Sequence, residues 1–222
     1  MTRPLVLVGS RNKFREFLAI AEAVNVEILG ILDCHYYGNQ DSICGIPVIG
    51  DERWLLNDDP RGALYRDTCD FFPANHHDGE QRLSTHSTDP SLENMHNLSG
   101  PDLRRKRLAI LDASGVNVIN LIHPDASVLG IKSKHANYKI GKGVLIDMNA
   151  AHGTDDVFIG DYCSFLPGSI LGYAVSTGRN TVIGPSTFLY DCNIGNDSYV
   201  GIYSKFNRSE ERRVGKECLR LC

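Results

Sequence analysis

The sequence has little of what several large classes of protein require. No run approaches eighteen apolar residues, so no membrane span is predicted. The start, residues 1–4, leads straight into an apolar stretch without the features of a signal peptide. The seven cysteines have no C-x-x-C spacing, which favours reduced thiols and a cytoplasmic location over a disulfide framework or a metal site. Lysine and arginine number 23 against 27 acidic residues, so no basic surface for general nucleic-acid binding is expected.

A six-residue repeat is present between about residues 140 and 203. In this stretch an aliphatic residue followed by glycine keeps returning, at Ile140, Ile159, Leu171, Ile183 and Ile194. The intervals from 159 to 171 and from 171 to 183 are both twelve residues, or two repeats of six. This period matches neither an α-helix nor the alternation of a simple hairpin.

A period of six predicts a coil with three flat sides, in which each repeat supplies one short strand and one corner. The aliphatic side chain points into a narrow interior, and Gly, Asn or Asp at the corner tolerates the left-handed backbone of a tight bend. One coil cannot bury its own apolar edge, so coils must stack into a parallel β-helix. The alternative is a chance run in an ordinary sandwich, where turn signals come every 8–12 residues.

The chain resembles the left-handed β-helix proteins known as hexapeptide-repeat acyltransferases. It is most similar to the sugar O- and N-acetyltransferases of the sialic acid O-acetyltransferase and UDP-4-amino-sugar (bacillosamine) N-acetyltransferase group. The resemblance covers most of residues 1–56 and 103–206, and it is carried by residues 45–50, 121–128, 159–162, 167–168 and 182–184. It implies a small Rossmann-like α/β domain, a left-handed parallel β-helix and transfer of an acetyl group.

The N-terminal part reads as a strand, a helix and a strand. Residues 5–9 and 26–33 are apolar runs, and residues 14–24 carry apolar side chains at helical spacing. In such a βαβ unit the loop after Gly9 and the side chain of Asp33 lie at the same carboxyl edge of the sheet, where nucleotides bind. A third strand over residues 45–50 and a helix from residue 51 follow.

The loop Gly9-Ser10-Arg11 and Asp33 form the predicted substrate site. The family holds the nucleotide part of a nucleotide-linked sugar here, with a Gly-rich loop that this chain keeps only in part. Arg11 has the planar fork to hold a diphosphate, and Asp33 has the oxygens to accept from ribose or base. An ordinary helix start with solvated basic residues is the competing interpretation.

The predicted domains are residues 1–114, which include a polar insertion at about 57–100, and a β-helix over residues 115–207. Residues 68–72 form one possible further strand of the small domain. A helix at 103–114 is expected to carry a basic outer face at residues 104–107, which is typical of a solvated helix surface, although phosphates of bound acetyl-CoA or of a nucleotide could use it. Residues 208–222 break the repeat and resemble a non-native read-through end, with a native charged tail as the alternative. No metal is expected, because the five candidate ligands have irregular spacing: His76, His77, Asp78, His86 and His96.

A solid coil interior leaves only the outside for a substrate. We therefore expect the reaction in grooves between subunits of a homotrimer, which the family resemblance also implies. Acetyl transfer needs a base for the acceptor's proton and a donor for the oxyanion. The resemblance implies acetyl-CoA as co-substrate, with Gly168, Gly172 and Tyr173 on its side of the site.

His152 is the candidate base, because the family places a histidine in this turn, ahead of an Ile-Gly pair and before an acidic residue. Here it lies seven residues before Ile159 where the family typically has four, and Gly153 replaces the acid. The interval from Ile140 to Ile159 is nineteen residues, which predicts a one-residue bulge. Two assignments stay open. In one His152 reaches the groove and is oriented by a carboxylate, Asp155 or Asp156; in the other His152 is structural.

Two functions from different classes follow. The first is an acetyl-CoA-dependent acetyltransferase that acts on an amino or hydroxyl group of a nucleotide-linked amino sugar, in surface glycan synthesis. The second is a non-catalytic β-helix scaffold or binding protein. A β-helical carbonic anhydrase is disfavoured, since the coil offers one well-placed histidine where zinc would need three.

Overall fold

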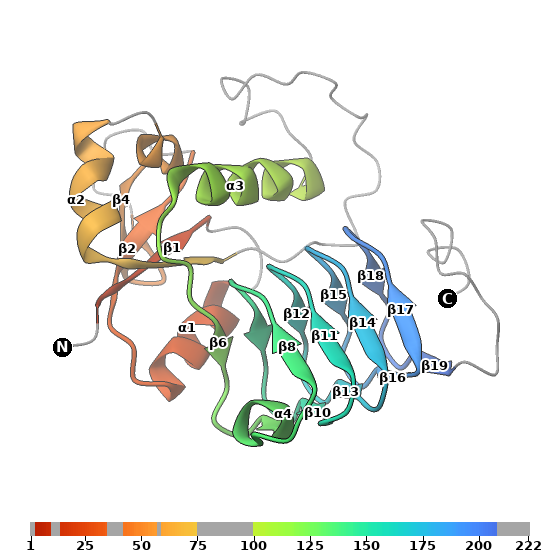
Figure 1. Ribbon diagram of the computed structural model, residues 1–222. Coiled ribbons are helices and arrows are strands. Elements are labelled where there is room, and N and C mark those ends of the chain that lie inside the picture. Colours follow the sequence, from red (N-terminus) through yellow and green to blue (C-terminus); the bar gives the residue numbers. More distant parts are fainter. Residues whose placement is uncertain (1–2, 10–13, 35–41, 57–58, 75–99, 208–222) are drawn as a thin grey trace. The chain divides into compact units, whose positions relative to one another are not determined.

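The computed structural model describes residues 3–9, 14–34, 42–56, 59–74 and 100–207 (Figure 1). The chain divides into two compact units, Met1–Ile119 and Asn120–Cys222, and each unit is described by itself. No helix among the described residues combines the length and apolar character needed to cross a membrane.

Unit 1 contains a five-stranded sheet with the strand order β3-β4-β2-β1-β5. Strands β1, β2, β4 and β5 are parallel, and only β3 runs antiparallel to its neighbour. Helix α1 connects the parallel strands β1 and β2, which confirms the predicted strand, helix and strand. The bounds are Leu5–Val8 for β1, Phe14–Ala23 for α1, Ile28–Leu32 for β2, Ser42–Ile43 for β3, Ile46–Gly50 for β4 and Asp70–Pro73 for β5.

The region predicted as a polar insertion contributes to this sheet. Residues 60–73 form helix α2, Pro60–Thr68, and strand β5, which pairs along β1. Asp59 caps α2 through the backbone N–H of Arg61, and Pro60 stands in the first turn, where its missing N–H costs nothing. The prediction of an insertion over 57–100 was therefore wrong for this part, while the strand near 68–72 is confirmed. The histidines at 76, 77, 86 and 96 lie outside the described residues.

Helix α3, Gly100–Ser114, corrects the predicted basic outer face at residues 104–107. Leu103, Leu108, Ile110 and Leu111 are buried, as their spacing predicts, but Arg104 and Arg107 are buried with them, at 1% and 0% exposure. Two of the four basic residues therefore face the protein interior. Arg105 stays outside and pairs with Asp102 at 2.7 Å.

Unit 2 is a parallel β-helix with three walls, as predicted (Figure 1). The walls have the strand orders β18-β15-β12-β9-β6, β19-β16-β13-β10-β7 and β17-β14-β11-β8, and every pairing within them is parallel. The strands are β6 (Leu121–Ile122), β7 (Ser127–Val128), β8 (Tyr138–Ile140), β9 (Leu145–Ile146), β10 (Ala151–His152), β11 (Val157–Ile159), β12 (Ser164–Phe165), β13 (Ile170–Leu171), β14 (Val175–Thr177), β15 (Val182–Ile183), β16 (Phe188–Tyr190), β17 (Cys192–Ile194), β18 (Tyr199–Val200) and β19 (Lys205–Asn207).

The interior of the β-helix is filled by equivalent side chains of successive coils. One column consists of residues that pair directly from coil to coil: Ile122, Ile146, Phe165, Ile183 and Val200. These side chains belong to one apolar cluster or pack against it. Stacked coils thus bury the apolar edge that a single coil exposes.

The coils differ in length at one corner only. Four residues separate the strands of the first and second walls in each coil, and four also separate the third wall from the first. Between the second and third walls the connections shorten along the chain, from nine residues (129–137, with helix α4, Leu129–Lys132) to four (153–156), three (172–174) and one (Asp191). We call this the variable corner. The predicted one-residue bulge is therefore at residues 153–156.

Candidate functional site

The carboxyl edge of the sheet in unit 1 gathers polar side chains. Gly9, whose φ of +89° favours glycine, directly follows strand β1, and Asp33 and Cys34 follow β2. Glu52 begins the short 3-10 helix η1, Glu52–Leu55, directly after β4, and Asp51 caps that helix. Parallel strands bring their carboxyl ends to the same edge, so these residues meet although they are far apart in sequence.

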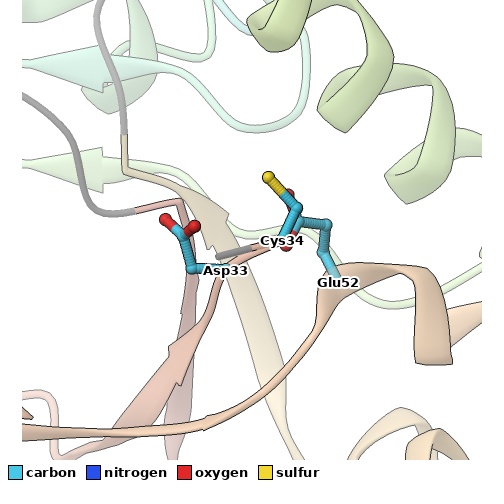
Figure 2. A group of neighbouring side chains, drawn as sticks. All are labelled: Asp33, Cys34 and Glu52. Atoms are coloured by element: carbon cyan, nitrogen blue, oxygen red, sulfur yellow. The ribbon is translucent and has the colours of Figure 1, made fainter. Parts of the chain in front are cut away.

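Arg107 from helix α3 reaches into this edge and binds three of these side chains. Its Nε donates to Glu52 Oε1 at 2.7 Å, and its Nη2 lies 3.0 Å from Asp33 Oδ2 and 3.7 Å from Cys34 Sγ. The side chains of Arg107 and Glu52 have no exposed surface, and that of Asp33 is 4% exposed. We call Asp33, Cys34, Glu52 and Arg107 the edge cluster; Figure 2 shows the first three.

The arrangement of Asp33, Cys34 and Glu52 could suggest a metal site. One ligand atom from each residue lies within 4.8 Å of the others. However, the guanidinium of Arg107 already contacts all three side chains and supplies the positive charge that their burial demands. The edge cluster is therefore an ion-paired network built around arginine.

Burial dominates the acid–base properties of the edge cluster. It raises the pKa of Glu52 to about 7, although Arg107 opposes this shift. It also raises the pKa of the Cys34 thiol to about 12, with the nearby charge of Glu52 acting in the same direction. Burial works against the charge on Arg107, but Glu52 and Asp33 outweigh it and raise the pKa of the guanidinium.

The predicted substrate residues have different outcomes. Gly9 and Asp33 do lie at one sheet edge, as expected, while Ser10 and Arg11 are outside the described residues. The N–H of Gly9 donates to Leu32 O at 2.8 Å, which continues the sheet. Asp33 is ion-paired to Arg107, so its carboxylate is held within the protein.

His152 in unit 2 faces the interior of the β-helix. It pairs in register with Val128 and Leu171, both buried, and it is 2% exposed. Its Nδ1 and the hydroxyl of Tyr138 are hydrogen-bonded at 2.9 Å, and its ring meets Phe165 edge-on at 4.7 Å. Its Nε2 is buried and has no hydrogen-bond partner within the described part of the chain.

This position contradicts the expectation that a carboxylate orients His152 toward a groove. Asp155 is exposed, and the Asp156 side chain accepts from Asn137 Nδ2 instead. The reason is strand geometry: alternate side chains point to opposite faces, so Ala151 faces out and His152 faces in. The extra residue of this coil comes after His152, and so it displaces the two aspartates without turning the ring. Burial lowers the pKa of His152 to about 3, so the ring is neutral at physiological pH.

The residues expected around acetyl-CoA also need a correction. The N–H of Gly168 donates to Met148 O at 3.1 Å, and the N–H of Gly172 donates to Leu189 O at 2.8 Å. Both amides hold neighbouring coils together, so neither points out to a thioester carbonyl. Tyr173 is 47% exposed, and its ring lies 6.0 Å from that of Tyr190 in the next coil.

The variable corner of the β-helix carries exposed carboxylate, tyrosine and aliphatic side chains. Asp155 and Tyr173 are exposed there, and so is Tyr190 at the adjoining end of β16, while Leu129 and Ile131 of helix α4 are 55% and 49% exposed. The other two corners keep one length in every coil. Sites in regular scaffolds concentrate where loops vary, so this corner is the best candidate for a site in unit 2.

Sequence reasoning did not identify Glu52 or Tyr138 as site residues, and it considered Arg107 only as part of a basic outer helix face that phosphates could use. Arg107 shares helical spacing with Leu103 and Ile110, and an arginine on an apolar stripe is the signal that could have found it. Tyr138 gave no such signal, because its contact with His152 depends on the pairing of separate coils.

Comparison with known proteins shows a shared fold at low sequence identity. No family model matches the chain, and no curated protein matches it. A solved mutant of GDP-perosamine N-acetyl transferase from Caulobacter crescentus, in complex with CoA and GDP-perosamine, matches at 21% identity with a TM-score of 0.57, over 92% of this chain and 89% of that chain. The acetyltransferase domain of PglB from Neisseria gonorrhoeae, in complex with acetyl coenzyme A, matches at 18% identity with a TM-score of 0.64, over 92% and 93%. WeeI from Acinetobacter baumannii matches at 13% identity with a TM-score of 0.56, over 93% and 92%.

Proposed function

We propose that this chain is an acetyl-CoA-dependent acetyltransferase that acts on an amino or hydroxyl group of a nucleotide-linked amino sugar. The observation that carries the proposal is the fold likeness over 92% of this chain and 93% of the PglB acetyltransferase domain, which was solved with acetyl coenzyme A. The likeness to a GDP-perosamine N-acetyl transferase, solved with its nucleotide sugar, supports the acceptor class. The low identities limit the likeness itself to the fold.

The proposed arrangement gives each unit a separate task. Unit 1 is a Rossmann-like domain that holds the nucleotide at the carboxyl edge of its parallel sheet, near Gly9 and Asp33. Unit 2 is a left-handed β-helix that binds acetyl-CoA on its outer surface, where Tyr173 offers an exposed ring. The enzyme works in the cytoplasm on precursors of surface glycans.

The reaction joins the acceptor to the acetyl group and releases free CoA. The acceptor nitrogen attacks the thioester carbonyl carbon, the C–S bond breaks, and the thiolate of CoA leaves and takes up a proton. The nitrogen loses one proton to a base, so that an amide and a thiol are the products. A base in this role contributes typically about 10²–10⁴-fold in rate.

We assign the base to the variable corner, with Asp155 as its first candidate and Asp156 beside it. Asp155 is exposed, whereas Asp156 is held by Asn137 and His152 is enclosed in the coil. A neutral ring with a pKa lowered to about 3 is a poor proton acceptor. His152 therefore has a structural part in this proposal.

A homotrimer is proposed because the coil interior leaves no room for a substrate. The outward side chains of the wall β19-β16-β13-β10-β7 include Ala151, Ile170 and Phe188, which pair in register and form an apolar strip. Ile170 is 42% exposed, and Tyr190 beside this strip is 38% exposed. A mass of three chains in light scattering is expected, and Ile170→Lys should convert it to the mass of one.

The experiment that tests the function measures thiol release from acetyl-CoA with UDP- and GDP-linked amino sugars. Asp155→Asn should lower kcat by about 100-fold or more, because the carboxylate that takes the proton becomes an amide. His152→Gln is the matched variant, and it should keep kcat within a few-fold while its melting temperature shows that it folds.

The opposite pattern, with Asp155→Asn active and a folded His152→Gln inactive, would return the role of base to histidine. No thiol release with any acceptor, together with no change in melting temperature on adding acetyl-CoA, would favour the non-catalytic scaffold.

A further inference from the structure

Two buried atoms of the edge cluster lack hydrogen-bond partners within the described residues. They are Arg107 Nη1, a donor, and Glu52 Oε2, an acceptor. Both side chains have no exposed surface. A buried polar atom without a partner is destabilising, so a ligand that supplies the missing partner recovers part of that cost.

Arg107 Nη1 lies against Gly9, at the end of β1. A Cβ atom built on Gly9 would be 2.6 Å from Nη1, so only glycine leaves room for the guanidinium. Strand β1 lies between β2 and β5, and the chain leaves β1 toward β2 and returns to β5 on the other side. Ligands of parallel sheets bind at such a reversal of strand order.

We propose that Arg107 Nη1 is an anion-binding group that receives a diphosphate oxygen of the nucleotide, with Glu52 as its internal counter-charge. The ligand class rests on the proposed function. A guanidinium fork suits phosphate oxygens, and two of its three nitrogens are already fixed by Glu52 and Asp33. The third nitrogen is therefore positioned before the ligand arrives.

The charges around Arg107 decide how strongly it attracts an anion. Asp33 and Glu52 face the guanidinium, and the thiol of Cys34 is neutral because burial raises its pKa to about 12. Asp51 and Arg53 of the neighbouring helix η1 pair with each other. With Glu52 ionised, the edge cluster carries one excess negative charge, and with Glu52 protonated it is balanced.

The sign of the pH effect follows from the raised pKa of Glu52, about 7. Below that value Glu52 is protonated and the edge cluster is neutral, so a diphosphate oxygen can accept from Arg107 Nη1 without repulsion by a second carboxylate. Above it the second carboxylate repels the ligand. Affinity for a diphosphate should therefore fall as the pH rises through about 7.

The test is calorimetric binding of UDP-N-acetylglucosamine and GDP-mannose to the full chain between pH 6 and pH 8.5. The diphosphates of nucleotide sugars stay ionised over this range, so the ligand itself does not titrate. The affinity of the unmodified protein should fall roughly 5- to 10-fold, which is the size of one charge–charge interaction in a partly solvated site. Glu52→Gln should keep the higher affinity at every pH.

Arg107→Lys keeps the charge but loses the planar set of guanidinium donors, so it should weaken the binding of both nucleotide sugars at every pH. Arg105→Lys, on the outside of the same helix, is the matched control and should bind as the unmodified protein does. Melting temperatures and circular dichroism confirm that each variant folds.

Any one of these results would overturn the proposal: an unchanged pH profile in Glu52→Gln, unchanged affinity in a folded Arg107→Lys, or no binding of either nucleotide sugar. A response limited to one of the two ligands would also overturn it, because it would point to the base and not to the shared diphosphate. If the protein releases thiol but the Glu52 and Arg107 variants bind the nucleotide sugars as the unmodified protein does, only this proposal is rejected. If binding depends on pH as expected but no thiol is released, only the proposed function is rejected.

Discussion

Arg107 in unit 1 and His152 in unit 2 are both buried basic side chains, yet they end in opposite states. Arg107 stays charged because the carboxylates of Asp33 and Glu52 lie at 3.0 and 2.7 Å. His152 stays neutral because burial disfavours its charged form, and its hydrogen-bond partner, the hydroxyl of Tyr138, brings no counter-charge. A buried cation persists only where counter-charges accompany it; otherwise the group gives up its proton.

The two units differ in how they collect such partners. The edge cluster draws on the ends of two strands and on a helix, so its members are up to 74 residues apart, from Asp33 to Arg107. The β-helix stacks residues one coil apart, at intervals of 24, 19, 18 and 17 along the column from Ile122 to Val200. A sheet edge can assemble a charged network, whereas a narrow coil interior mostly repeats one apolar side chain.

Removing the cation from the edge cluster should give the largest effect. Arg107→Met leaves Asp33 and Glu52 buried without compensation, which typically costs about 3–5 kcal/mol of unfolding free energy. Denaturant unfolding measures the loss, and amide hydrogen exchange in β1 and β2 assigns it to unit 1. Arg105→Met, at the surface, should change stability by less than about 1 kcal/mol. Equal losses in both variants would show that the edge cluster is not special.

Closing the space between coils should give the next largest effect. A Cβ on Gly160 would lie 2.7 Å from the backbone N of Arg179, so Gly160→Ala should cost about 1–3 kcal/mol in unit 2. Gly195→Ala is the matched control in the last described coil, where the nearest atom is Ser198 Oγ at 3.8 Å, and it should be nearly neutral. A neutral Gly160→Ala, measured by denaturant unfolding, would mean that the coils are less closely packed than described.

The neutral His152 should make stability depend on pH. The unfolded chain binds a proton at this histidine below about 6.5, while the folded chain does not until about 3. Stability should therefore fall as the pH drops from 6.5 toward 3, by about 1.4 kcal/mol per pH unit from this group.

The variant with His152→Leu and Tyr138→Phe removes the buried pair together, so neither partner is left unpaired. Its unfolding free energy, measured by denaturant titration at several pH values, should lack this component of the slope. His135→Gln, at the surface, should keep it. The same slope in all three proteins would mean that His152 is solvated.

The smallest effect should come from shortening the variable corner. Deleting Thr154 leaves three residues between β10 and β11, the length that residues 172–174 have in the next coil. Stability should change by less than about 0.6 kcal/mol, the typical cost of doubling a flexible loop, since the next coil already closes the same corner with three residues. Deleting Ser169, from a corner that always has four residues, should abolish cooperative unfolding because it shifts the register. Equal effects would remove the distinction between the corners.

Much of the fold followed from local patterns. The alternation of strand and helix over residues 5–32 predicted the parallel pair β1 and β2, and the returning Ile-Gly pairs predicted the stacked coils. The region 60–73 was misjudged because Asp59 and Pro60, which read as loop residues, begin a helix. Breakers at a helix start look the same in sequence as breakers inside a loop.

The sites were less predictable, because a shift of a single residue along a strand or helix changes which neighbours a side chain meets. Gly9 and Asp33 were placed at the right edge, but Arg107 and Glu52 joined them through packing. His152 was predicted to face a groove, but its position in the strand, one residue after the outward-facing Ala151, points it into the coil.

The sequence by itself determined the period of six and the strand–helix–strand order, since both express which side chains must be buried and at what spacing. Only the tertiary structure decided which groups lie next to each polar side chain: Arg107 contacts two carboxylates, and His152 contacts a tyrosine inside the coil. The spacing of apolar residues shows which faces of a chain must be buried, but charge compensation depends on segments that meet only after folding.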